Sequence, residues 1–182
     1  MSIVTTPAVT TWKVDSAHTS VEFAVRHLMI TTVKGRFAEV SGIVKSDDAD
    51  PAKGEVDITI NAASIDTREA QRDAHLRSAD FFEVEKYPTI SFRSKRIDDV
   101  KVDRFTLVGD LTMHGVTKEV ALDVTSEGQA KDPWGGERAG FTATGKVKRS
   151  EFGLTWNQLL ETGGLTVGDD IKISLDVELV KA

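Results

Sequence analysis

The chain has 182 residues, of which 40% are hydrophobic and 29% are charged, a composition typical of one globular domain with a sizeable core. The net charge of −6 disfavours nucleic acid and anionic membranes as partners. The lack of cysteine excludes disulfides, thiolate metal sites and a cysteine nucleophile. No signal peptide and no run of ~20 apolar residues is found, so we expect a cytoplasmic protein without an integral membrane segment.

Apolar and polar residues alternate along most of the chain, and this alternation predicts β-strands. Residues 1–10 are small and polar and are expected to form a flexible arm, whereas residues 11–182 are expected to form a single domain. Between residues 33 and 45 the alternation changes phase, which predicts a bulge or bend near residues 39–42. His114 and Gly115 are expected to form the tight turn of a hairpin.

Residues 62–92 contain the one long segment with helical character. Asp66 is followed three residues later by Glu69, a capping-box pattern that predicts a helix starting near Thr67. Residues 68–77 contain no glycine, proline or β-branched residue, which favours the helix. We expect this short helix to plug one end of a β-domain. Its predicted apolar anchors are Leu76, Phe81 and Phe82.

The predicted strands number about eight, and several run to ten or more residues. Long antiparallel strands in this number favour closure, because closure removes exposed sheet edges. The expected fold is therefore all-β with one short helix: an antiparallel eight-stranded barrel with the helix packed near one end. Such a barrel can be filled by its own side chains or can hold a ligand, and the pattern of residues leaves both possibilities open.

Two basic residues share the inward parity of their strands. His27 either donates to a ligand head group or bonds to a backbone carbonyl at its strand end. Arg149 needs a partner, because a buried unpaired charge is costly. That partner is a ligand phosphate or carboxylate, or a protein carboxylate such as Asp73. The apolar residues Trp156 and Leu159 are expected in a pocket rim, a dimer contact or the core, together with Leu160.

Arg72, Asp73 and His75 lie within one predicted helical turn and form a candidate polar cluster over the barrel entrance. Asp73 and His75 are two residues apart, and side chains at this spacing do not face each other on a helix. No nucleophile motif, local histidine metal pair or glycine-rich phosphate loop occurs. We therefore expect no catalytic residues, no metal and no cofactor.

A series of short motifs in a fixed order resembles the YceI-like family of lipid-binding proteins from about residue 12 to residue 180. The motifs include Val-Asp-Ser-Ala-His-Thr-Ser-Val-Glu-Phe at 14–23, Arg-Asp-Ala-His-Leu at 72–76, Tyr-Pro-Thr-Ile-Ser-Phe at 87–92 and Arg-Ser-Glu-Phe-Gly at 149–153. The resemblance implies a lipocalin-like barrel with an apolar tunnel that holds a long-chain isoprenoid, such as a polyprenyl diphosphate or a quinone tail, or a related amphipathic lipid. It also implies a homodimer.

We therefore expect a carrier, storage or sensing protein for such a lipid. The candidate tunnel lining is Phe23, Val25, Phe37, Ile58, Ile60, Phe81, Phe82, Phe92, Leu107, Leu111, Phe141, Ile173 and Leu175. The candidates for the head group, or for ion pairs that frame it, are His27, Arg72, His75 and Arg149. The alternatives are an enzyme that acts on such a lipid through Asp73 and His75, and a structural module with a solid barrel.

Overall fold

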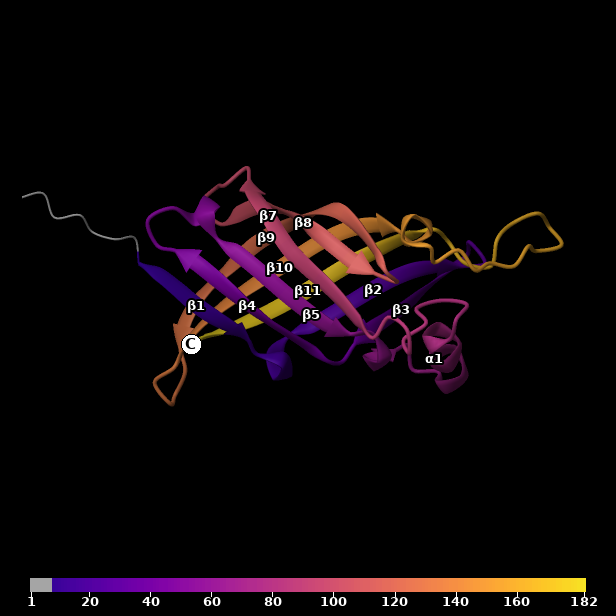
Figure 1. Cartoon of the computed structure of the whole chain (residues 1–182), viewed down its shortest axis with the longest axis horizontal. Helices are drawn as coiled ribbons and strands as arrows, with labels where there is room; N and C mark the ends of the chain where they lie inside the picture. The colour runs from indigo at the N-terminus through magenta and orange to yellow at the C-terminus, as the bar shows by residue number, and fades with distance from the viewer. Residues whose placement is uncertain (1–7) are drawn as a thin grey trace, which may run out of the picture.

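The computed structural model describes residues 8–182, which form one twisted antiparallel sheet of eleven strands and one short α-helix (Figure 1). The strands are β1 (Val9–Val14), β2 (Ser20–His27), β3 (Thr31–Phe37), β4 (Val40–Asp47), β5 (Glu55–Asn61), β6 (Ile65–Asp66), β7 (Thr89–Asp98), β8 (Arg104–Met113), β9 (Val116–Lys131), β10 (Glu137–Lys148) and β11 (Asp170–Lys181). The helices are α1 (Ala70–Arg77) and the 3₁₀ turns η1 (Ser16–His18), η2 (Pro51–Lys53), η3 (Ala62–Ser64) and η4 (Arg149–Phe152).

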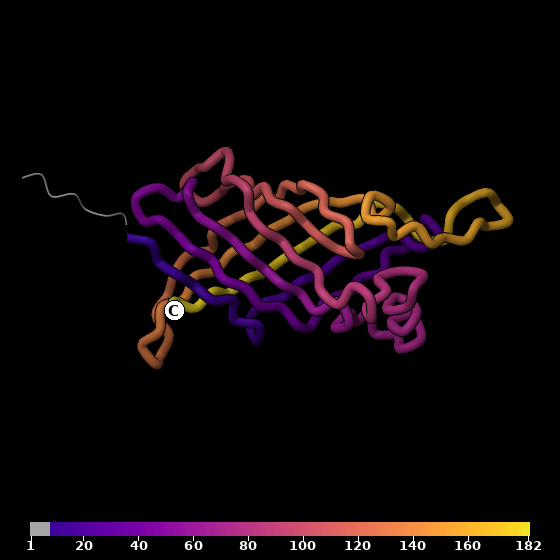
Figure 2. Tube along the Cα trace, viewed as in Figure 1, coloured from indigo at the N-terminus to yellow at the C-terminus, as the bar shows by residue number. Residues whose placement is uncertain are grey.

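The sheet closes into a barrel because β1 pairs with β4 on one side and with β11 on the other. Three wall strands are interrupted: β1 continues into β2 through η1, β3 into β4 through residues 38–39, and β5 into β6 through η3. β1 and β2 both pair with β11, at Leu179 and at Leu175 respectively, so they occupy one position in the wall. The eleven segments therefore make the predicted eight-stranded barrel (Figure 2).

Two details at the amino-terminal side differ from the predictions. β1 starts at Val9, two residues inside the predicted arm, and residues 1–7 of that arm lie outside the described residues. The predicted change of phase is present as the break between β3 and β4 at residues 38–39. Because of this break, Phe37 and Val40 are both buried although their parities differ, while Ile43 is exposed on the outer face.

Alternation along each strand sorts side chains between the barrel interior and solvent. On β5, Val56, Ile58 and Ile60 are half-buried, whereas the residues between them are exposed. Full burial of such a side chain stabilises a fold by about 1.5–3 kcal/mol and half-burial by less, so a strand register that puts this face outward is disfavoured. The β8–β9 hairpin has the predicted turn, with φ of 52° at His114 and 72° at Gly115.

The helix begins later than the capping-box pattern predicts. Arg68 has a φ of 65°, a left-handed conformation that a helix does not contain, so α1 starts at Ala70. Glu69 is the N-cap residue, and its carboxylate accepts hydrogen bonds from the backbone N–H groups of Gln71 and Arg72. Asp66 instead accepts from the backbone N–H of Arg68. The helix packs near one end of the barrel, opposite the chain's carboxyl terminus (Figure 2).

Candidate functional site: an apolar cavity inside the barrel

The barrel is hollow, with an interior cavity of about 280 Å³. This volume lies near the lower end of the ~300–1,000 Å³ range of small-molecule sites. Along β11 the cavity wall runs from Ile171 to Leu179, which at ~3.3 Å per residue and a strand tilt of ~40° corresponds to a length of about 20 Å. The cavity is therefore long and narrow. A barrel filled solid by its side chains, one of the alternatives above, does not describe this molecule.

All thirteen apolar residues predicted for the tunnel lie in the cavity wall. They come from β2, β3, β5, β7, β8, β10 and β11 and from the segment after α1, so the wall is built from the whole circumference of the barrel. The prediction missed many further wall residues, including Val14, Val40, Val44, Val56, Phe105, Leu122, Val124 and Val147. Most of these residues share the strand parity of the predicted inward positions, so the same alternation would have identified them.

The wall is almost wholly apolar. Among the described residues that line it, three have polar side chains: Thr19, Glu22 and Arg149. Glu22 is exposed, and Arg149 directs its guanidinium at backbone carbonyls of the loop that follows it. An apolar cavity of this kind has too few polar partners to hold ordered water and favours an apolar guest.

Two glycines make room for large aromatic rings in this wall. Gly109 on β8 faces Phe92 on β7, and a Cβ atom at Gly109 would lie 2.5 Å from Cζ of that ring. Gly35 on β3 is covered in the same way by the ring of Phe23 on β2. A side chain at either glycine would push the ring into the cavity, so these glycines help to set the width of the channel.

The barrel end beside α1 is covered by two segments. The first is the α1 segment, which we define as α1 and the turns after it, residues 70–88, and which contributes Leu76, Phe81 and Phe82 to the wall. Phe82 packs edge-on against Phe37, with ring centroids 5.8 Å apart, and this contact seats the α1 segment on the barrel.

The second cover is the capping loop, which we define as residues 153–169. It contributes Leu154 and Val167 to the cavity wall. Trp156 of this loop packs 5.3 Å from the ring of Phe81 and 4.7 Å from the ring of His75, so the two covers meet over the end of the barrel.

Arg149 holds the capping loop by hydrogen bonds to four backbone carbonyls. Its guanidinium donates to the carbonyls of Leu154, Trp156 and Gly168 at 2.8 Å and to that of Val167 at 3.2 Å. Burial lowers the pKa of this guanidinium below its usual range. Asp73 is not the partner, because its carboxylate bonds to Thr67, so the expected pairing with Asp73 was wrong. The carbonyl oxygens of the capping loop stabilise the buried positive charge of Arg149, as a carboxylate was expected to do.

Asp73 is buried and has a different role. Its carboxylate accepts hydrogen bonds from the backbone N–H and the hydroxyl of Thr67, which ties the loop before α1 to the helix. Arg72 donates to the hydroxyl and the carbonyl of the same threonine. The ring of His75 lies 2.8 Å from Asp80. Asp73 and His75 thus bond to different partners, and neither lies in the cavity wall.

His27, the remaining candidate, also lies outside the cavity wall. It is half-buried at the end of β2, where its backbone bridges to Val167 of the capping loop. The structure therefore does not bring His27, Arg72, His75 and Arg149 together into one polar site. Of the four, Arg149 alone contributes to the wall.

The end of the barrel away from α1 is closed by packed side chains. Trp12 is buried there against Ala139 and Leu179, and its indole N–H donates to the hydroxyl of Ser46 at 3.1 Å. The α1 end, in contrast, is covered by two segments outside the sheet.

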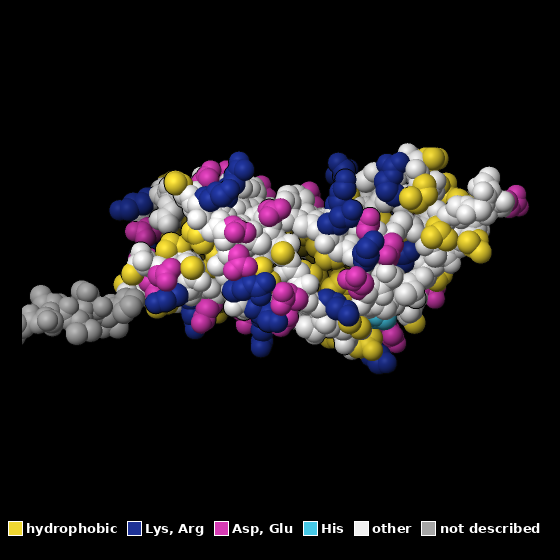
Figure 3. All heavy atoms as spheres, turned by 90° about the horizontal axis from the view of Figure 1, so that it is seen from above, with side chains coloured by type: hydrophobic (Ala, Val, Ile, Leu, Met, Phe, Trp, Pro, Cys, Tyr) yellow, Lys and Arg dark blue, Asp and Glu magenta, His cyan; other side chains and the backbone are white. Residues whose placement is uncertain are grey.

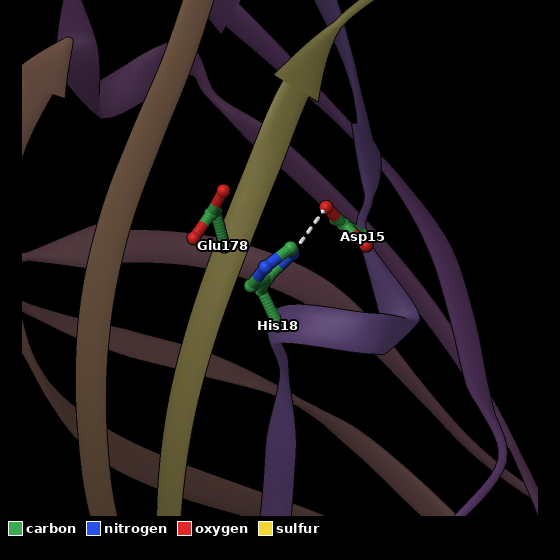
Figure 4. Close-up of side chains that lie close together, drawn as sticks. All are labelled: Asp15, His18 and Glu178. Atoms are coloured by element: carbon green, nitrogen blue, oxygen red, sulfur yellow. Dashed lines mark hydrogen bonds and ion pairs between the residues drawn. The ribbon is translucent and has the colours of Figure 1, made fainter. Parts of the chain in front are cut away.

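Asp15, His18 and Glu178 bring potential metal ligands within 4.8 Å of one another at the η1 kink (Figure 4). However, Nη1 of Arg138 lies 2.7 Å from Asp15 and 2.6 Å from Glu178, so a guanidinium already supplies the positive charge. Hydrogen bonds from His18 and Arg138 lower the pKa of Asp15 to about 2. We interpret this cluster as an ion-pair network that ties η1 to β10 and β11.

No α-helix within residues 8–182 has the length and apolar character needed to cross a lipid bilayer. A closed antiparallel barrel around an apolar cavity places the protein in the class of lipocalin-like barrels. Within that class the chain belongs to the YceI-like domain family, which matches residues 12–179.

Relatives and solved structures agree with this assignment. A UPF0312 protein of Serratia proteamaculans is 41% identical over 94% of this chain and 86% of its own. The crystal structure of BcnA from Burkholderia cenocepacia superposes with a TM-score of 0.79 at 25% identity, over 91% of this chain and 98% of that one. A polyisoprenoid-binding domain from Saccharophagus degradans has the same fold, with a TM-score of 0.67 at 14% identity, over 94% and 98% of the two chains.

Proposed function

We propose that this protein binds a long-chain isoprenoid or related amphipathic lipid, such as a polyprenyl diphosphate or an isoprenoid quinone, inside its barrel, as a carrier, store or sensor. The observation that carries the proposal is the long, narrow cavity with an apolar wall. A channel of about 20 Å exceeds the ~15 Å of one bilayer leaflet's hydrocarbon region, so it suits an extended chain.

The energetics also favour a long chain over a compact guest. Each buried methylene contributes about 0.8 kcal/mol, so ten or more buried carbons offset the association cost without a strong polar contact. A wall of this kind selects for chain length and girth. The Saccharophagus domain is described as polyisoprenoid-binding, which is consistent with the proposal, but its 14% identity supports the shared fold alone.

Native mass spectrometry of the purified protein, with and without added ubiquinone or a polyprenol, tests the proposal. We expect one additional mass per chain that disappears on organic extraction and returns when the lipid is added. The proposal would be rejected if no preparation carried a lipid and neither compound were taken up at micromolar concentration.

An enzyme that acts on the same lipid is the second candidate, and the geometry gives it less support. Asp73 and His75, the residues on which it depends, are bonded to Thr67 and Asp80 and do not reach the cavity. The homodimer and the cytoplasmic location stay predictions. Light scattering after size exclusion tests the first, and cell fractionation tests the second.

A further inference from the structure

Two loops at the α1 end display aliphatic side chains to solvent. In the β2–β3 turn, Met29 is 55% exposed and Ile30 is 72% exposed. In the capping loop, Leu159 is 78% exposed and Leu165 is 44% exposed. Apolar side chains gather on the projecting loop at this end of the molecule (Figure 3), and we call these four residues the aliphatic tip.

The aliphatic tip is an ordered surface. Leu159 and Leu165 face each other across a narrow hairpin that is closed by a hydrogen bond from the Leu160 N–H to the Gly164 carbonyl. The backbone N–H of Leu28 donates to the carbonyl of Thr166, which joins the β2–β3 turn to the capping loop. The backbones of the two loops are therefore joined.

The β2–β3 turn is built at a conformational cost. Leu28 and Met29 have φ values of 51° and 60°, in the left-handed region where a two-residue turn normally uses asparagine and glycine. Placing large aliphatic residues at such positions does not favour the turn, and exposing Met29 there does not favour the solubility of the chain. An exposed apolar surface of this kind indicates a contact with another apolar phase.

We propose that the aliphatic tip docks the protein on the surface of a lipid bilayer. Two narrow loops carry far fewer residues than the 20–30 per side of a stable protein interface, whereas a few aliphatic side chains can enter the ~5–10 Å interfacial layer of a membrane. The capping loop that carries Leu159 and Leu165 also forms the cavity wall through Leu154 and Val167. Docking would place the cover of the cavity against the membrane.

The charge of the chain defines the type of membrane contact. With a net charge of −6, the protein gains nothing overall from an anionic surface, so the contact is made by apolar insertion and should resist salt. This inference goes beyond lipid binding in the barrel, because docking requires no lipid in the cavity.

Flotation with phosphatidylcholine vesicles tests the docking surface. The double variant Ile30→Ser, Leu159→Ser is expected to bind at least about tenfold more weakly than the parent protein. The matched control is Val100→Ser, Val102→Ser, which removes two exposed apolar side chains, 47% and 105% exposed, from the turn between β7 and β8 at the opposite end of the barrel. The control variant should float like the parent, and 0.5 M salt should not release either.

Three results would overturn the proposal that the aliphatic tip docks on a bilayer. They are a parent protein that does not float, a control variant whose vesicle binding is weakened equally, and a self-association of the parent that the tip variant abolishes. Circular dichroism confirms that the variants are folded. Uptake of a polyprenol by the tip variant in detergent measures lipid binding inside the barrel without a membrane. Failure of docking is therefore distinguishable from failure of lipid binding.

Discussion

At the scale of single residues, the ion-pair network around Arg138 shows how charge fastens the kinked wall strand. Arg138 on β10 contacts Asp15 before η1, Glu178 on β11 and Asp132 in the β9–β10 turn. These carboxylates raise the pKa of the guanidinium, so it stays charged at every accessible pH. The side chain of Asp15 is 17% exposed, so water weakens its interactions only in part.

Asp15 should make the stability of the protein depend on acid pH. Its folded-state pKa of about 2 lies below the ordinary value of 3.8, so its contribution is fully present above pH 4 and is lost as the pH falls towards 2. We expect Asp15→Asn to lower the free energy of unfolding at pH 7 by about 1–2 kcal/mol and to have little effect at pH 2. Urea unfolding across this range measures the difference.

Asp57→Asn is the control for that experiment, because the side chain of Asp57 is 57% exposed and lies 3.6 Å from Arg93. An exposed pair at this distance contributes about 0–1 kcal/mol. An Asp15→Asn loss that is equally large at pH 2 and pH 7 would show that the effect comes from packing and that the charge of Asp15 is not responsible.

At the scale of elements, the two covers of the cavity are held in different ways. The α1 segment is seated by aromatic packing and capped by Glu69, whereas the capping loop contains no helix and is held by Arg149. The capping loop also packs through Trp156 and bonds to the β2–β3 turn through Thr166, but Arg149 alone donates to four of its carbonyls, so losing Arg149 should loosen this cover.

Arg149→Met should therefore loosen the capping loop and destabilise the barrel end. Four carbonyls lose their charged donor, and we expect a loss of at least about 3 kcal/mol, equivalent to a fall in Tm of roughly 6–12 °C. Hydrogen exchange should increase most in residues 153–169.

The neighbouring variant Lys148→Met is the control, since Lys148 is exposed and pairs with Asp170 on the surface. We expect it to change stability by less than about 1 kcal/mol. Equal effects of the two variants would contradict the assigned role of Arg149 in holding the loop.

At the scale of the whole molecule, the barrel is a tube closed at one end by Trp12 and covered at the other by α1 and the capping loop. The width of the channel depends on small residues that lie among large ones in its wall. Ala143 on β10 is buried in the wall between Val124 on β9 and Leu175 on β11. Enlarging this position narrows the channel midway along its length.

We expect Ala143→Leu to shift binding towards shorter chains, with roughly tenfold weaker uptake of the longest prenyl lipid that the parent protein accepts. Native mass spectrometry with a series of polyprenols of increasing length measures the shift. Thr144→Leu changes the next residue of the same strand, which is exposed, and should leave the length preference as it is. An unchanged preference in Ala143→Leu would argue against binding inside the channel.

The alternating pattern and the strand lengths favoured a closed barrel of about eight strands, and turn chemistry predicted the β8–β9 turn, while the position of the helix near one end also followed from the family resemblance. The start of α1 was not predictable in the same way. Asp66 and Glu69 matched a capping box, but Arg68 adopts a left-handed conformation and Asp73 bonds to Thr67, and both depend on how the segment meets the barrel.

The amino-acid sequence by itself determined which side chains face inward, since inward parity follows from the two-residue period of a strand. Tertiary structure alone decided whether those side chains leave a channel, because the free space depends on strand tilt and on which residues meet across the axis. It also decided what Arg149 contacts, because the carbonyls that surround it belong to a loop whose path back over the barrel no local pattern encodes.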